Sequence, residues 1–169
     1  MMLIPPTRFD DNTKDELLDS AESLVFELGG GLDVDAFLSI VRELMFNVVQ
    51  HSGEGEGSFS LESDEYQVVA RVEDSGVGIH HNMSLAYPGL SELETLMKAL
   101  ERGGTSTGYN TRGFGLFWAV MYTEAIPGAF FVLTTGETAC MALEGESRIV
   151  STSGDFHQGV AAELCVPFE

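Results

Sequence analysis

Basic side chains are scarce in this sequence: 8 Lys and Arg stand against 27 Asp and Glu among 169 residues, a formal net charge of -19. A surface of this sign repels nucleic-acid phosphates and anionic lipid head groups, so nucleic acid is not an expected partner. The same field repels a polyphosphate, which would need Mg²⁺, backbone N–H groups and the few local cations in order to bind. The positions of the few arginines therefore bear on where a phosphate group could bind.

Cysteines and long hydrophobic runs are also lacking. Cys140 and Cys165 are too few for a disulfide-rich secreted scaffold, and they have no metal-binding spacing. The apolar N-terminus stops at Pro5 and Pro6 and carries no basic residue, so it predicts neither a signal peptide nor membrane insertion. We therefore expect a cytoplasmic protein with two reduced cysteines.

The apolar content, 44% of residues, is enough for the core of one domain that spans residues 1–169. Apolar residues at helical spacing predict four helices, over residues 12–28, 33–51, 91–102 and 113–123. Asp33 is the expected N-cap of the second helix. Strand-like segments predict a hairpin after that helix and four more strands between residues 128 and 168. Residues 1–11 are expected to form a flexible arm.

The order of these elements favours an α+β fold. Helices grouped with antiparallel strands predict a two-layer sandwich, in which a mixed, mostly antiparallel sheet is covered on one face by about three helices. Between residues 79 and 112 the patterns weaken into His, Asn, Pro and Gly, around the single helix predicted there. A segment this long with so little strand character predicts a functional loop or lid.

Three stretches could carry chemistry, and the first is RELMFNVVQHS. It places Glu43, Asn47 and His51 four residues apart, on one face of the second predicted helix. A carboxylate one turn from an amide can hold water and Mg²⁺, which takes few protein ligands. Taken alone, such a line is more often a solvated helix face, with His51 complementing the helix dipole.

The second stretch is VEDSGVGI, in which an acid ends a strand and two glycines follow. Asp74 could accept a hydrogen bond from the exocyclic amine of a purine, because a buried carboxylate without a partner is costly. Gly76 and Gly78 would let the backbone turn close to a flat ring, with Ile79 as an apolar wall. A plain Asp-Ser-Gly turn after a strand explains the same residues equally well.

The third stretch is TSTGYNTRGFGLFWAV, a glycine-rich run that opens onto an apolar one. If Gly113 and Gly115 begin a helix, its free N–H groups form an anion site, to which Ser106 and Thr107 add hydroxyl donors. Arg112 is placed to reach a terminal phosphate. A glycine hinge before a core helix is the alternative. The sequence contains no GxxxxGK[ST] and no GxGxxG motif, which sets P-loop and Rossmann sites aside.

In this order the three stretches resemble the N box and the two glycine boxes of the GHKL ATPase superfamily. That superfamily includes histidine kinases, anti-sigma-factor serine kinases, type II topoisomerases, mismatch-repair proteins and a heat-shock chaperone. The resemblance extends from residue 33 to about residue 168 and implies the family's two-layer Bergerat-type fold, with residues 79–112 as the ATP lid. Gln50 and Gly108 differ from the Lys or Arg that many kinase members have at these places.

The resemblance also implies cofactors, ATP and Mg²⁺, and a role for each residue. Asn47 would coordinate Mg²⁺, Glu43 would orient or deprotonate the attacking group, and Asp74 would bind the adenine amine. The remaining ATP-binding residues would be His51, Gly76, Gly78, Ile79, Ser106, Thr107, Arg112, Gly113, Gly115 and Leu116.

The length narrows the expected branch of the family. Topoisomerases, chaperones and complete sensor kinases need further domains that do not fit into 169 residues. We therefore expect a free-standing domain, similar to sensor-kinase catalytic domains and anti-sigma-factor serine kinases, that transfers the γ-phosphoryl group of ATP to a separate protein or hydrolyses ATP to control it. Two alternatives stay open, a nucleotide-dependent binding switch without turnover and an interaction module that has lost ATP. The sequence leaves the phosphoacceptor, Ser or His, undecided, and a homodimer is possible.

Overall fold

The computed structural model describes residues 1–29, 31–101 and 115–168, and these residues form seven strands and five helices. In chain order the elements are β1 (Met2–Phe9), α1 (Lys14–Leu28), α2 (Val34–His51), β2 (Gly57–Ser63), β3 (Gln67–Asp74), α3 (Gly78–Ala86), α4 (Glu92–Leu100), α5 (Gly115–Ala125), β4 (Phe130–Gly136), β5 (Thr138–Leu143), β6 (Glu146–Ser151) and β7 (His157–Pro167).

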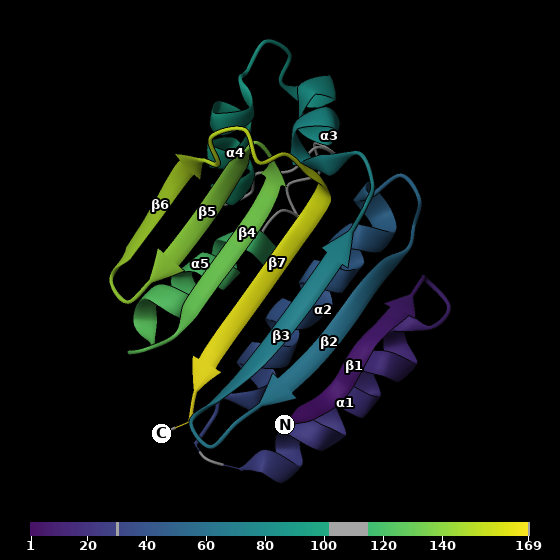
Figure 1. Ribbon diagram of the computed structural model, residues 1–169, viewed down its shortest axis with the longest axis vertical. Helices are drawn as coiled ribbons and strands as arrows, with labels where there is room; N and C mark the ends of the chain where they lie inside the picture. Colours follow the sequence, from purple (N-terminus) through teal and green to yellow (C-terminus); the bar gives the residue numbers. More distant parts are fainter. Residues whose placement is uncertain (30, 102–114, 169) are drawn as a thin grey trace.

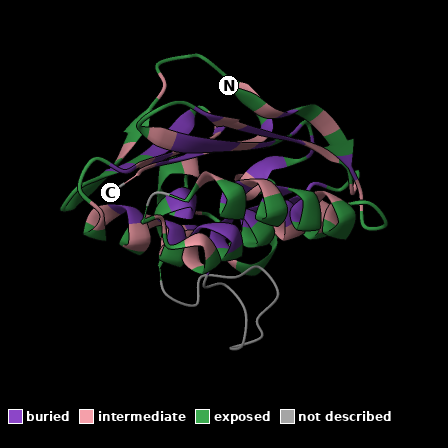
Figure 2. Ribbon diagram, turned by 90° about the horizontal axis from the view of Figure 1, so that it is seen from below, coloured by how far each residue is buried: buried purple, intermediate pink, exposed green. Residues whose placement is uncertain are grey.

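The strands form one sheet in the order β1-β2-β3-β7-β4-β5-β6, and every described pair is antiparallel (Figure 1). The C-terminal strand β7 lies in the middle and joins the two meanders β1-β2-β3 and β4-β5-β6. All helices cover the same face of the sheet (Figure 2). The predicted two-layer α+β sandwich is confirmed, with an antiparallel sheet and five helices where a mixed sheet and about three helices were expected.

The core lies between the sheet and α2. Val68, Ala70 and Val72 alternate along β3 and point at the helices, as the period of two along a strand requires. Helix α2 buries one broad face and begins where predicted, because the Asp33 carboxylate accepts the N–H of Ala36 at 3.0 Å.

The N-terminal residues are not the flexible arm that was predicted. They form β1, which pairs with β2 and buries Ile4 and Phe9 in the core. Pro5 and Pro6 concealed this strand, but proline is tolerated on an edge strand, and the pairing register shifts between Ile4 and Thr7 around them.

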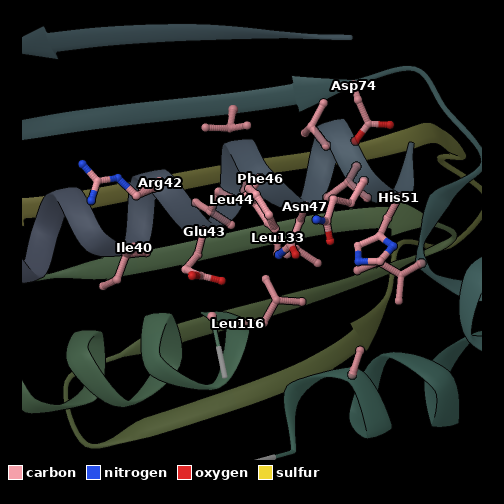
Figure 3. A pocket seen from close by; sticks show the side chains of 18 of the residues that line it. Ile40, Arg42, Glu43, Leu44, Phe46, Asn47, His51, Asp74, Leu116 and Leu133 are labelled. Atoms are coloured by element: carbon pink, nitrogen blue, oxygen red, sulfur yellow. The ribbon is translucent and has the colours of Figure 1, made fainter. Parts of the chain in front are cut away.

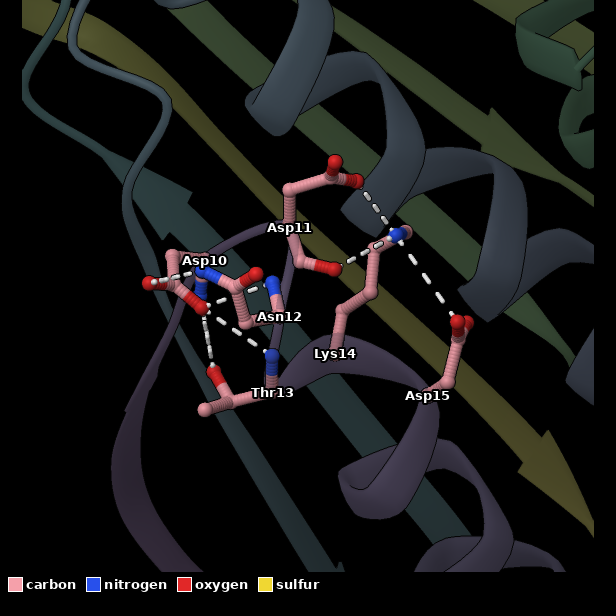
Figure 4. Close-up of polar contacts among 6 residues, drawn as sticks. All are labelled: Asp10, Asp11, Asn12, Thr13, Lys14 and Asp15. Atoms are coloured by element: carbon pink, nitrogen blue, oxygen red, sulfur yellow. Dashed lines mark hydrogen bonds and ion pairs between the residues drawn. The ribbon is translucent and has the colours of Figure 1, made fainter.

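A tight polar turn leads from β1 into α1 (Figure 4). The Asp10 carboxylate accepts the N–H groups of Asn12 and Thr13 at 2.9 and 3.0 Å and the hydroxyl of Thr13 at 2.9 Å. Lys14 pairs with Asp11 at 2.6 Å. This turn fixes α1 beside the edge strand.

The segment 79–112 was predicted as a lid with one helix, and its described part contains two. Helix α4 begins with a capping box between Ser91 and Glu94, which confirms the helix predicted there. Helix α3 was not predicted, because its His and Asn residues are weak helix formers and tertiary contacts support it. Residues 102–114 lie outside the described part of the chain. Among the described helices, none is long and apolar enough to cross a membrane.

Candidate functional site

A cavity of about 800 Å³ lies on the helical side of the sheet, between α2 and helices α3, α4 and α5 (Figure 3). Eight of the residues singled out in the sequence line it: Glu43, Asn47, His51, Asp74, Gly78, Ile79, Gly115 and Leu116. Gly76 is not part of the lining, but its N–H donates to the Asp74 carboxylate. Ser106, Thr107, Arg112 and Gly113 lie outside the described residues. The first two stretches and the described end of the third thus surround one cavity, although they are far apart in the sequence.

Asp74 ends β3 at one end of this cavity, and its side chain is buried, with the residue 7% exposed. Its Oδ1 accepts the N–H of Gly76 at 2.8 Å. Burial raises the pKa of this carboxyl above its ordinary value, although the N–H groups of Gly76 and Val160 counteract the rise. The walls around it are apolar, formed by Val72, Ile79, Met83, Leu133, Val160 and Ala162. A flat apolar ligand with one hydrogen-bond donor fits this end.

The glycines of the second stretch are required by close packing of the backbone. A Cβ on Gly76 would lie 1.9 Å from the carbonyl oxygen of Ser52, which itself accepts the N–H of Val77 at 2.8 Å. Gly78 has φ +75°, and its Cβ would lie 3.0 Å from Oγ1 of Thr135. The loop after β3 is therefore held against the end of α2 and against β4.

Glu43 and Asn47 lie on the face of α2 that lines the cavity, one turn apart (Figure 3). The first turn of α5 approaches them closely: a Cβ on Gly115 would lie 2.8 Å from Cβ of Glu43 and 2.9 Å from its Oε2. Glu43 therefore lies where α2 meets the N-terminal end of α5. The described residues contain no group of three His, Cys, Asp or Glu placed to hold a metal ion.

Four residues that support the site were not identified in the sequence. Thr135 accepts the N–H of Ile79 on Oγ1 at 3.1 Å, and the Asn82 amide donates to the backbone oxygens of His51 and Gly78. Gln158 donates to the carbonyl of Gly76, and a Cβ on Gly159 would lie 2.2 Å from the backbone oxygen of Asp74. Only Gly159 had a local signal in the sequence, as a glycine near the start of the final strand. The others act through strand neighbours and helix contacts that sequence spacing does not reveal.

A protein-family model described as "Histidine kinase-, DNA gyrase B-, and HSP90-like ATPase" matches residues 32–167. The match covers most of the chain, including α2, both strands of the hairpin and the closing strand. No curated protein matches the chain.

Proposed function

The chain belongs to the histidine kinase-, DNA gyrase B- and HSP90-like ATPase family, and from this premise we propose that it is a Mg²⁺-dependent ATPase or protein kinase that acts on a separate protein partner in the cytosol. ATP binding follows from the family. The transfer of the γ-phosphoryl group, the metal and the partner are the proposal. One observation carries it: a single cavity of about 800 Å³ joins Asp74 at one end to Asn47 and Glu43 along α2.

The adenine end of the site would be at Asp74. One carboxylate oxygen is held by the N–H of Gly76, and the second can accept the adenine amine. The apolar walls would exclude water from the faces of the ring; they are formed by Val72, Ile79, Met83, Leu133, Val160 and Ala162. Burial of Asp74 makes the contact selective, because a base that offers no donor leaves the carboxylate without a partner.

The phosphate end would be at α2 and the start of α5. Asn47 offers an amide oxygen, and Mg²⁺ characteristically takes one or two such oxygens together with phosphate oxygens and water. Such an ion, when bound, neutralises charge that develops on the phosphoryl group. The N-terminal N–H groups of α5, beginning at Gly115, add a positive field at the same end.

Glu43 would orient or deprotonate the attacking group. Its carboxylate lies at the junction of α2 with α5, one turn from Asn47, and in this proposal it would lie beside the phosphates and away from the adenine. The attacking group is water for an ATPase and a partner's side chain for a kinase. An exposed aromatic residue, Trp118, lines the same cavity and gives a partner an apolar contact there.

The test begins with calorimetric titration of the protein with Mg·ATP. Saturable binding is expected, and its absence at millimolar ATP would remove the proposal. Phosphate release is then compared for the wild type, Glu43→Gln and the exposed control Glu16→Gln on α1. We expect Glu43→Gln to bind ATP normally and to lose at least tenfold in turnover, within the usual contribution of a general base. Equal turnover in all three proteins would assign Glu43 no catalytic role, and ATP binding without any release would favour the switch.

A further inference from the structure

The helices leave one face of the sheet uncovered (Figure 2). This face has an unusual composition. Residues opposite one another in the sheet share a face, so the register defines rows across it. One row runs from Val69 through Cys165, Phe130 and Leu143 to Glu146. The next runs Arg71, Glu163, Val132, Met141, Arg148, and the third Glu73, Ala161, Thr134, Ala139, Val150. Where these rows cross β4, β5 and β6, apolar residues predominate.

We call this region the outer patch and define it by Phe130, Val132, Met141, Leu143 and Val150. Met141, Leu143 and Val150 are 44%, 47% and 38% exposed. A solvated face of an antiparallel sheet ordinarily alternates with polar residues. Here, bulky apolar side chains from three adjacent strands stand together on the solvent side, which is typical of an interaction surface.

The neighbouring part of the same face is polar, and its charges are paired. Arg71 makes ion pairs with Glu62 on β2 and with Glu163 on β7, the second at 2.5 Å. At the far edge, Arg148 pairs with Glu146 at 3.0 Å. These pairs frame the outer patch and leave little net charge beside it.

The charge of this face favours a second copy of the chain as its binding partner. On the outer side its strands carry three arginines (Arg8, Arg71 and Arg148) against four glutamates (Glu62, Glu73, Glu146 and Glu163), a net charge of -1 where the chain has -19. A cationic partner would be drawn to the rest of the surface instead. Two copies of so acidic a chain repel each other wherever their acidic surfaces meet, and this face is where they can approach with little repulsion.

The size of the face suits a dimer. The whole face, of which the outer patch is the apolar part on β4, β5 and β6, has seven strands about 4.8 Å apart. With roughly seven residues per strand at about 3.3 Å per residue, it presents roughly 800 Å². A stable protein–protein interface buries about the same area on each partner. Two sheets stack face to face about 10 Å apart, with interdigitated side chains.

We propose that the outer patch docks a second copy of the chain, so that two sheets pack face to face around a two-fold axis. The same patch then serves both protomers, as two-fold symmetry requires. The helical layers and the two cavities lie on the outside of this dimer. The inference does not depend on ATP or on turnover.

The experiment is sedimentation equilibrium of the wild type, Met141→Glu and a control, Phe26→Glu. Phe26 on α1 is 76% exposed, lies on the helical side and is outside the segment assigned to the ATP lid. Met141→Glu is tolerated by the monomer because Arg148 lies opposite it on β6. We expect the wild type and Phe26→Glu to have twice the 18.3 kDa mass of the chain, and Met141→Glu to dissociate at least tenfold more readily.

Two further readouts make the result decisive. Added salt is expected to strengthen the dimer, because it screens the repulsion between two acidic chains. Calorimetry is expected to give the same ATP affinity for all three proteins, which separates this inference from the proposed function. A wild type that sediments as a single 18.3 kDa chain even at about 100 µM would overturn it, because a dimer with a micromolar Kd is mostly formed at this concentration. A dimer that Met141→Glu leaves intact would overturn it equally.

Discussion

Replacing Asp74 by Asn tests the adenine assignment with almost no change in shape. The oxygen Oδ1 accepts the N–H of Gly76 at 2.8 Å, so the amide oxygen of the variant must take this place. The amide nitrogen of Asn then occupies the position of the second carboxylate oxygen, and it carries donors only. An adenine amine that meets this group faces a donor where it needs an acceptor.

The expected loss follows from the hydrogen bond that is broken. A hydrogen bond to a charged group contributes about 1.5–3 kcal/mol, and leaving a buried group without a partner costs about 1–3 kcal/mol. Taking about 1–3 kcal/mol for the change, and 1.4 kcal/mol for each factor of ten, Kd for ATP rises by about 5-fold to about 140-fold. Guanine presents a carbonyl oxygen in place of the amine, so the same variant is expected to bind GTP better than the wild type does.

The assay is calorimetric titration with Mg·ATP and Mg·GTP, with Glu73→Gln as the control. Glu73 is the preceding residue on β3, is exposed and lies on the opposite face of the sheet. We expect Asp74→Asn to bind ATP more weakly and GTP more tightly than the wild type, and Glu73→Gln to have unchanged affinities for both. An Asp74→Asn protein that is folded and binds ATP as tightly as the wild type would refute the placement of adenine at this carboxylate.

Three further predictions concern the residues around Asp74. Because burial raises the pKa of Asp74, the charge of this carboxylate destabilises the folded protein above that pKa, and this cost disappears as the pH falls towards about 3.9. The free energy of unfolding of Asp74→Asn minus that of the wild type, measured by urea titration, should therefore be smaller at acidic pH than at neutral pH. Thr135→Val leaves the Ile79 N–H without its acceptor and should lower stability by about 1–3 kcal/mol, whereas Thr134→Val, on the other face, should not. Gly159→Ala should weaken ATP binding and lower Tm more than Gly145→Ala does, because both have positive φ but only at Gly159 would a Cβ meet Asp74.

The parts of the fold that the sequence predicted are those with strong local signals. Helix α2 has a capping aspartate and an apolar face that continues at helical spacing over 18 residues, so both its position and its start after Asp33 were predicted. The strands after residue 128 are separated by glycine turns and were predicted as well. Such signals depend on neighbours in the chain, which is why they can be read without the structure.

The parts that were missed depend on contacts between distant segments. Strand β1 was hidden by its prolines, which only the edge position makes acceptable. Helix α3 has little helical propensity and is held by Thr135, which accepts the N–H of Ile79, and by the Asn82 amide, which donates to the carbonyl of His51 on α2. The line of Glu43 and Asn47 on one helix face could be predicted, but the approach of Gly115 to Glu43 could not, because it depends on how two helices pack.

The two faces of β4 and β7 separate the proposed functions physically. Thr135 and Val160 lie opposite each other and face the helical side, where Val160 lines the cavity, whereas the adjacent pair, Thr134 and Ala161, faces the outer side. Dimer contacts therefore press on side chains that point away from the nucleotide. Coupling between the sites would require the strands themselves to move, since coupling needs an element with two arrangements. For this well-paired central sheet we expect none, so the affinity for ATP should stay constant as the protein concentration, and with it the fraction of dimer, is raised.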